Sequence, residues 1–506
     1  MKFADNYPTL ARFGRLLWKR TRPWVRPMGF ILVSLATLVA LVVAAENYRT
    51  GKAWENYKSA ARARGEKLTL AELAPPMVPD DQNFAMTPLL KPLFTDPAYG
   101  GELAGRLRLV NPDEISATPE LGDWRTGQRT DLAELAEFLH QPDVLTGLQP
   151  YNLELAEISA AIVRPFSRFP IAYDRHPSAS ILLPHLQPIV AFGRLFCLRG
   201  VAELATGKND AALADVLTVL RLAQATRDEP TFVSKMVVLV VVQQALQIIW
   251  EGLAARQWSE PQLAVLQREM EKLDLMPQLI GAERGERAFY IETIEWMEQL
   301  GFVERLEFFS RIGAVGREGQ ASLPLPVKAL LALPFVANRA LLAGMQFDDQ
   351  YLVGAWDPVK RQIDLSCLNL GRDFVHEISG KSWFIHPESL YLARLLPAWE
   401  GMVAGFAEAQ TSVAEAAVAC ALERSRLATG HYPKKLDELA PQFISQLPAD
   451  LITGGPLLYL RDGADHFVLY SFGWSGTDNH DEVYKEKRGG DFNLMTENWV
   501  WQYPTP

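Results

Sequence analysis

The sequence has only three cysteines and no paired-cysteine motif. Cys197, Cys367 and Cys420 are widely spaced and form no CxxC pair, which excludes a disulfide-stapled scaffold and a zinc ribbon and allows one disulfide bond at most. Cys420 lies on an apolar helical stripe, and a free buried thiol behaves as a small hydrophobic side chain. We therefore predict that Cys420 is a buried thiol.

The short motifs of nucleotide, hydrolase and zinc-protease chemistry are absent as well. There is no GxxxxGK[ST] phosphate loop and no GxSxG elbow, because the stretch around Ser475 has the wrong spacing. His376-Glu377 is not followed by a second histidine at the HExxH position, which Gly380 occupies, and the eight histidines are scattered. The sequence predicts no catalytic residue and no cofactor site.

Basic charge is scarce everywhere except at the start of the chain. Lys and Arg number 50 against 60 Asp and Glu, a net charge of −10. Residues 1–27 hold seven Lys or Arg and one Asp, a net +6, so the remainder carries −16. Binding to nucleic acid requires cations that neutralise phosphates, so the acidic remainder excludes nucleic acid as a partner. The basic residues 1–27 are better explained as a topology signal.

One stretch of 18 residues, Met28–Ala45, contains no charged side chain. As a helix it would be about 27 Å long, close to the roughly 30 Å of a bilayer core, so we predict a transmembrane helix with the lipid bilayer as its partner. Residues 13–27 hold five Lys or Arg and residues 46–60 hold three, which favours an N-terminus in the cytoplasm. The alternative is a signal peptide cleaved before Glu46, although this apolar run exceeds the usual length of about 7–15 residues.

Four further segments follow from composition and periodicity. Residues 1–27 form a basic cytoplasmic tail. Residues 46–100 form a helical stalk followed by a linker that six prolines interrupt. Residues 101–398 form an α-helical body, and residues 399–506 form a small α+β module with an antiparallel hairpin. The predicted fold class is mainly α, with a single N-terminal transmembrane helix.

Within the body, small residues predict an αα-hairpin that turns at Gly207-Lys208, with Asn209 as a helix cap. Phe232–Trp250 predicts a buried helix, and its rival interpretation is a second membrane span. Ser259 and Gln262 form a capping box. Further on, we expect helix in residues 338–370 and irregular structure in residues 371–390.

The C-terminal module begins with apolar residues at helical spacing from 399 to 429, and Gly430 ends that helix. Two short β-patterned segments, Pro456–Leu460 and Phe467–Ser471, flank a turn at Asp462-Gly463 and predict a hairpin. This order of motifs resembles the soluble domain of the type II secretion major pseudopilin. The matching residues are Gly430, Tyr432, Pro433, Leu447, Pro448, Asp450, Thr453, Gly454, Pro456, Tyr459, Tyr470, Ser471 and Gly473.

The resemblance covers residues 400–482 and implies a calcium ion in the last loop, with Asp478 and Asp481 as ligands; carboxylate oxygens suit Ca²⁺. The chain departs from a pseudopilin in two respects. Ser34 stands where the family has a Glu, and roughly 350 residues separate the apolar helix from the module. We therefore interpret the module as reuse of a small domain and not as a pilus subunit.

These observations predict a membrane-anchored extracytoplasmic scaffold or partner-binding protein of a bacterial envelope, without catalytic activity. Its N-terminus would lie in the cytoplasm, the bulk of the chain in the periplasm, and its partner would be another envelope protein. Two alternatives remain. The first is an extracytoplasmic hydrolase whose acidic or histidine side chains meet only in the folded chain, and the second is a pseudopilin-related secretion component.

Overall fold

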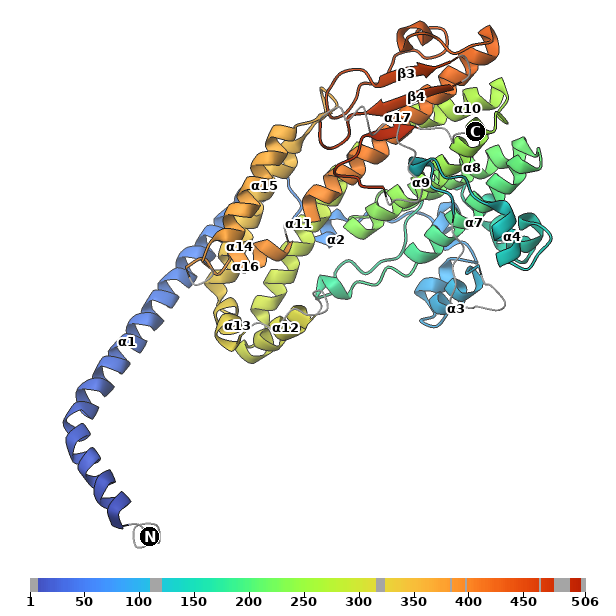
Figure 1. Ribbon diagram of the computed structural model, residues 1–506. Helices are drawn as coiled ribbons and strands as arrows, with labels where there is room; N and C mark the ends of the chain where they lie inside the picture. Colours follow the sequence, from blue (N-terminus) through green and yellow to red (C-terminus); the bar gives the residue numbers. More distant parts are fainter. Residues whose placement is uncertain are drawn as a thin grey trace.

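The computed structural model describes residues 8–109, 121–314, 324–382, 385–395, 398–463, 466–476 and 492–501. The protein is mainly helical (65%) and has a small antiparallel sheet, so the predicted fold class is confirmed at this level. Figure 1 shows one long N-terminal helix, α1, that projects from a compact arrangement of the other elements. We call residues 64–501 the body and Glu46–Ala63, the last part of α1, the stalk.

The helices of the body are short at its start and long in its middle. They are α2 (Leu70–Leu73), α3 (Tyr99–Arg106), α4 (Leu132–Phe138), α5 (Val144–Gly147), α6 (Asn152–Ala161), α7 (Leu186–Ala205), α8 (Asn209–Gln224), α9 (Phe232–Ala254), α10 (Glu260–Lys272), α11 (Met276–Gln299), α12 (Phe302–Ala314), α13 (Leu325–Leu331), α14 (Pro334–Phe347), α15 (Leu365–Gly380), α16 (Ser389–Leu395) and α17 (Ala398–Thr429). The strands are β1 (Trp356–Asp357), β2 (Gln362–Ile363), β3 (Leu458–Asp462), β4 (His466–Ser471) and β5 (Trp499–Trp501).

Helix α1 runs without a break from Pro8 to Ala63 and so contains both the predicted span and the stalk. Its apolar part is not covered by the body; Phe30 is 75% exposed and Leu41 is 63% exposed. Among the described residues, two helices are long and apolar enough to cross a membrane, Pro27–Ala63 and α9, and a third span would result if the bent pair α13–α14 acted as one. Two thirds (67%) of the most apolar window of α9 is buried inside the protein, against 0% for the N-terminal helix.

The αα-hairpin is confirmed as the pair α7 and α8. Gly207 occupies the turn with a φ of +73°, a conformation that glycine adopts without steric cost. The close approach occurs at Gly200, where an added Cβ would lie 3.1 Å from the Ile248 side chain of α9. The predicted cap was wrong, because Lys208 holds the cap position and the Asn209 amide donates instead to the Gln257 carbonyl at 2.5 Å.

The predicted buried helix and capping box are also present. Helix α9 lies in the middle of the core and packs against α7, α8 and α17. Ser259 and Gln262 cap α10 reciprocally, and α10 packs along α17. One continuous cluster of buried apolar residues extends from Leu70 to Trp501. The core is therefore not interrupted at the predicted module boundary between residues 398 and 399.

The C-terminal hairpin is present as β3 and β4, paired antiparallel with Tyr459 opposite Leu469. Gly430 follows α17 with a φ of +84°. A third strand, β5, pairs with β4 so that the sheet order is β3-β4-β5; this strand was not predicted from the sequence. In Figure 1 this sheet lies along one side of α17.

Residues 371–390 were expected to be irregular. Helix α15 continues to Gly380, so the first half of this segment is helical. The apolar residues before it belong to the α13–α14 pair, which bends by 68°. Val336 and Ala337, at the start of α14, are 0% and 1% exposed. These residues form core, together with Trp54 of the stalk.

Candidate functional site

The predicted calcium ligands, Asp478 and Asp481, lie outside the residues that the structure describes. Within the described ranges, no group of three or more His, Cys, Asp or Glu side chains could hold a metal ion. Calcium binding by this loop stays a prediction.

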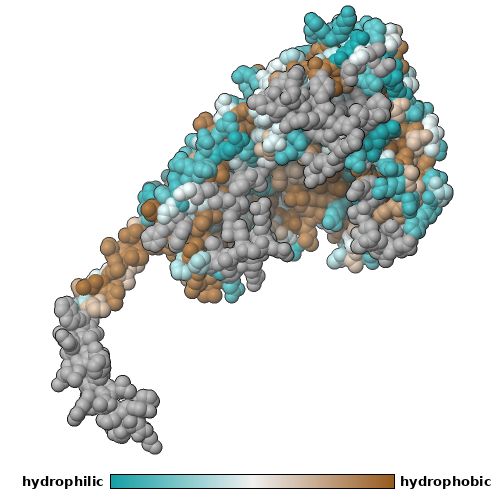
Figure 2. All heavy atoms as spheres, viewed as in Figure 1, coloured by the Kyte–Doolittle hydropathy of each residue, from teal (hydrophilic) through white to brown (hydrophobic). Residues whose placement is uncertain are grey.

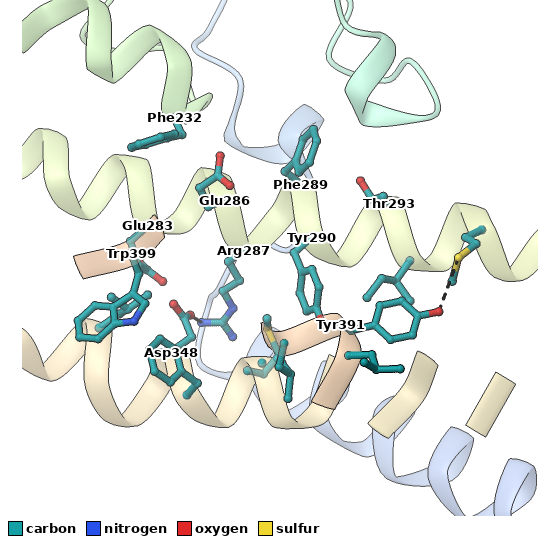
Figure 3. A pocket seen from close by; sticks show the side chains of 18 of the residues that line it. Phe232, Glu283, Glu286, Arg287, Phe289, Tyr290, Thr293, Asp348, Tyr391 and Trp399 are labelled. Atoms are coloured by element: carbon teal, nitrogen blue, oxygen red, sulfur yellow. Dashed lines mark hydrogen bonds and ion pairs between the residues drawn. The ribbon is translucent and has the colours of Figure 1, made fainter. Parts of the chain in front are cut away.

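The candidate site is a cavity of about 250 Å³ enclosed by α11, α14, α16 and the start of α17. Its walls are mostly aromatic and apolar, but four charged side chains also line it: Glu283, Glu286, Arg287 and Asp348. Three of these come from α11, at positions 283, 286 and 287. Figure 3 shows Glu283 and Arg287 directed toward Asp348 of the neighbouring element, whereas Glu286 points toward Phe232. An apolar cavity with a few convergent polar groups is the usual form of a ligand site.

Asp348 reaches the cavity because α14 does not end in an ordinary turn. A π-helical segment, Asp348–Leu352, follows it directly, and such wide turns occur frequently at functional sites. Asp348 is 5% exposed and Glu283 is 7% exposed. Burial raises the pKa of both carboxyls, and the nearby Glu283 carboxyl raises that of Asp348 further. Two adjacent buried carboxyls cannot both be ionised at low cost, so the pair favours a state in which one carboxyl is protonated.

Arg287 connects this cavity to the stalk. Its guanidinium forms ion pairs with Glu66 at 2.5 Å, Asp348 at 3.4 Å and Asp349 at 3.4 Å. It also donates a hydrogen bond of 2.6 Å to the Tyr57 hydroxyl of the stalk. Because the guanidinium is only 7% exposed, these contacts supply the partners that a buried cation requires.

Glu286 is the most exposed of the carboxyls in the cavity lining. The protein around it raises the pKa of Glu286 to about 7 by desolvation. A carboxyl that titrates near neutral pH can hold or release a proton under ordinary conditions.

Two polar groups deeper in the cavity lack hydrogen-bond partners within the described residues, the Tyr290 hydroxyl and the Thr293 hydroxyl. Tyr391, next to Tyr290 in Figure 3, differs because its hydroxyl donates to the Leu331 carbonyl at 3.0 Å. The Oε1 atom of Glu283 also lacks a partner. The cavity therefore presents an acceptor and two hydroxyls that a bound molecule could satisfy.

A second, more open hollow of about 380 Å³ lies where α15 meets the C-terminal module. Arg372 forms an ion pair with Glu400 there, and the Trp474 indole donates to the same carboxylate at 3.0 Å. Because the carboxylate is already paired with both groups, this hollow offers no free charge. Its contacts join α15 to the loop after β4.

Other buried titratable groups lie in closed parts of the core. His185 is fully buried beside Glu229 at 2.8 Å and stacks on Phe169 at 4.0 Å between ring centroids. Glu408 and Glu415 of α17 are 5% and 0% exposed. None of these residues lines the cavity or the second hollow, so we assign them to the core and not to a site.

The residues that line the cavity belong to no sequence motif. On α11, Glu283, Glu286 and Arg287 lie within about one helical turn. The small residue Gly285 between them indicates a closely packed helix face. An added Cβ at Gly285 would lie 1.5 Å from the Pro230 carbonyl. Asp348 lies 65 residues after Glu283 in the sequence, so no local pattern joins them. Comparisons with protein families, curated proteins and solved structures found no match to this chain.

Proposed function

We propose that this protein is a membrane-anchored, extracytoplasmic partner-binding protein of a bacterial envelope. The supporting observation is that the apolar part of α1 continues without a break into the stalk, and that the stalk forms hydrogen bonds and ion pairs with the body. A body joined to its anchor in this way has a fixed position at the bilayer surface. Such a position suits recognition of another envelope component.

The joint between stalk and body lies at the first residues after the apolar stretch. The Glu46 carboxylate pairs with Arg339 of α14 at 2.7 Å. The Asn47 side chain accepts a hydrogen bond of 2.8 Å from the Phe335 backbone amide. The bend between α13 and α14 is therefore level with the end of the span.

Further along the stalk, Trp54 and Lys58 both bond to Glu295 of α11, at 2.9 Å and 2.8 Å. Trp54 is 3% exposed and belongs to an apolar cluster shared with α11 and α14. These contacts bury one side of the stalk along the body, so the stalk does not act as a flexible tether.

Exposed apolar residues next to this joint support contact with the bilayer surface. Phe302 and Val303 of α12 are 49% and 67% exposed, and Leu325 of α13 is 67% exposed. In Figure 1, α12 and α13 form the end of the body nearest the apolar part of α1, and Figure 2 shows hydrophobic residues on that end. Apolar side chains at the level of the headgroups are stabilised by partial insertion.

For topology, we retain the single span and the cytoplasmic N-terminus. Helix α9 is largely occupied by core contacts, and the start of α14 packs on the stalk, so both are poor candidates for further spans. The bias of Lys and Arg toward residues 13–27 favours a periplasmic body. The N-terminal helix by itself is compatible with either orientation.

Protease accessibility tests this proposal. The full chain, with an N-terminal tag, is expressed in a bacterium and spheroplasts are treated with protease. We expect the body to be digested and the tag to be protected, and a chain lacking residues 1–45 to leave the membrane fraction. A protected body, or a truncated chain that stays membrane-bound, would contradict the proposal.

Partner binding is tested in the same cells by crosslinking in intact envelopes. We expect the body to crosslink to a second envelope protein, and a chain that stays solitary and monomeric would contradict the scaffold role. The truncated chain is the control for crosslinks that need membrane anchoring.

A hydrolase is the second candidate function, because Glu283, Glu286 and Asp348 all line the cavity. The raised pKa of Glu286, about 7, suits a general acid or base. If the protein hydrolyses a substrate, Glu286→Gln is expected to lower kcat about 100-fold or more without a matching change in KM. An unchanged kcat would remove Glu286 from that role.

A further inference from the structure

The cavity contains acidic groups that no basic side chain neutralises. Among the described residues that line it, Arg287 is the only cation, and the guanidinium is already shared among Glu66, Asp348 and Asp349. Within the described residues, neither Glu283 nor Glu286 forms an ion pair. The cavity therefore has an excess of negative charge whenever these carboxyls ionise.

The Glu283 carboxyl shares a hydrogen bond with Asp348 but has no cation of its own within the described residues. The residue is 7% exposed and lines the cavity, yet its Oε1 atom accepts no hydrogen bond within the described part of the chain. A buried polar atom without a partner is costly. A donor on a bound molecule would remove that cost, so this atom indicates where a ligand's polar end would lie.

The rest of the wall is suited to an apolar cation. Tyr290, Phe309, Phe347 and Trp399 face the same cavity, and aromatic faces attract organic cations as well as apolar groups. An anion would meet the carboxyls without a free cation to balance it. By charge, the wall therefore selects a cationic or neutral ligand.

We propose that this cavity binds a small organic ammonium ion, whose N–H groups donate to Glu283 and whose apolar part lies against the aromatic wall. A cavity of about 150 Å³ holds benzene, so 250 Å³ corresponds to about ten non-hydrogen atoms. This ligand is a small molecule and not the protein partner proposed above, so the inference stands independently of membrane topology.

Three probes of nearly equal shape test the proposal by charge: 4-phenylbutylamine, 4-phenylbutanol and 4-phenylbutanoate. Each is titrated calorimetrically into the full chain in lipid nanodiscs, with empty nanodiscs as the blank for partitioning. We expect the amine to bind at least about tenfold more tightly than the alcohol, because a hydrogen bond to a charged group exceeds a neutral one. The carboxylate should bind most weakly.

Glu283→Gln is the decisive variant, because it removes the charge and keeps the size of the side chain. It should lower the affinity for the amine at least about tenfold and leave the affinity for the alcohol unchanged, which also reports an intact cavity. Glu292→Gln is the matched control: Glu292 is a buried glutamate of the same helix, 6% exposed and bonded to Ser178, and it does not line the cavity.

Four outcomes would overturn the proposal. They are equal binding of amine and carboxylate, unchanged amine affinity in E283Q, equal loss in E283Q and E292Q, and no binding of any probe below about 1 mM. If E283Q bound neither amine nor alcohol, the order of the three probes on the unchanged protein would decide the question alone. Failure of protease protection or crosslinking would leave these titrations unaffected.

Discussion

Replacement of Glu415 by glutamine should stabilise the protein at neutral pH. Glu415 lies in the middle of α17 and is 0% exposed, and both of its carboxyl oxygens lack hydrogen-bond partners within the described chain. Burial raises the pKa of Glu415 well above its ordinary value of 4.5, and the nearby acids Glu408 and Asp450 raise it further. The folded protein therefore keeps a proton on this carboxyl.

The size of the effect follows from the difference between pH 7 and the ordinary pKa of 4.5. Each pH unit above that value adds about 1.4 kcal/mol to the cost of keeping the proton, so the cost at pH 7 is on the order of 3 kcal/mol. The unfolded chain releases the proton above pH 4.5, so the stability of the native protein falls as the pH rises from there. This contribution disappears at pH 4.5 and below.

Glu415→Gln carries no charge at any pH and should lose this dependence. Thermal unfolding of the full chain in nanodiscs, followed by tryptophan fluorescence, measures it. For a body of roughly 450 residues with about 2.1 cal/mol/K of unfolding entropy per residue, a change on the order of 3 kcal/mol corresponds to about 3 °C in Tm. We expect that gain at pH 7 and almost none at pH 4.5.

Two further variants separate charge from hydrogen bonding. Glu415→Met also removes the polar group and should add about 1–3 kcal/mol at both pH values. Glu423→Gln is the control on the same helix, because Glu423 is buried but paired with Arg426 at 2.6 Å and with the Tyr432 hydroxyl at 2.8 Å; it should destabilise the protein. A gain for E415Q that did not change between pH 4.5 and pH 7, or a loss at pH 7, would refute the reasoning.

Three other predictions test packing, charge and thiol burial. Gly285→Ala should lower Tm sharply, because its Cβ would lie 1.5 Å from the Pro230 carbonyl, whereas Gly401→Ala has open space and should gain up to about 1 kcal/mol; equal effects would contradict the close approach. Arg287→Met should cost about 3–5 kcal/mol in denaturant unfolding, because it leaves buried carboxyls without their cation, and a neutral result would contradict that role. Native protein should take up at most one maleimide, at half-buried Cys367, since the other two cysteines are buried and free; labelling of all three before denaturation would contradict the fold.

Local patterns predicted the elements whose signal is local. The Ser259–Gln262 capping box, the turn at Gly207 and the uninterrupted apolar helix α9 each depend on residues within a few positions of one another. Strand β5 depends on pairing with β4 across an intervening segment, and three residues carry too little periodicity to reveal it. The helix through residues 371–380 was not predicted; it belongs to α15, which packs against α16, and no local pattern reveals that contact.

The candidate site was not predictable for a related reason. Its chemistry needs Glu283 and Asp348, which meet only when α11 packs on α14 and the π-helical turn brings the second carboxyl inward. Neither residue belongs to a recognisable motif. From the sequence, convergence of acidic or histidine side chains was part of the hydrolase alternative only.

Arg287 makes the anchor and the cavity one structural unit. The Nη2 atom of its guanidinium bonds to Tyr57 of the stalk and to Glu66 just beyond it. The Nη1 atom pairs with Asp348 in the cavity lining. Because a buried cation needs all of these partners, a change at the stalk end alters the charge balance inside the cavity. Glu66→Gln, which leaves the cavity lining intact, should therefore strengthen the hold of Arg287 on Asp348 and lower the pKa of that carboxyl. An infrared titration of the Asp348 carboxyl in the wild type and in E66Q measures this, and identical titrations would show that the stalk and the cavity are electrostatically independent.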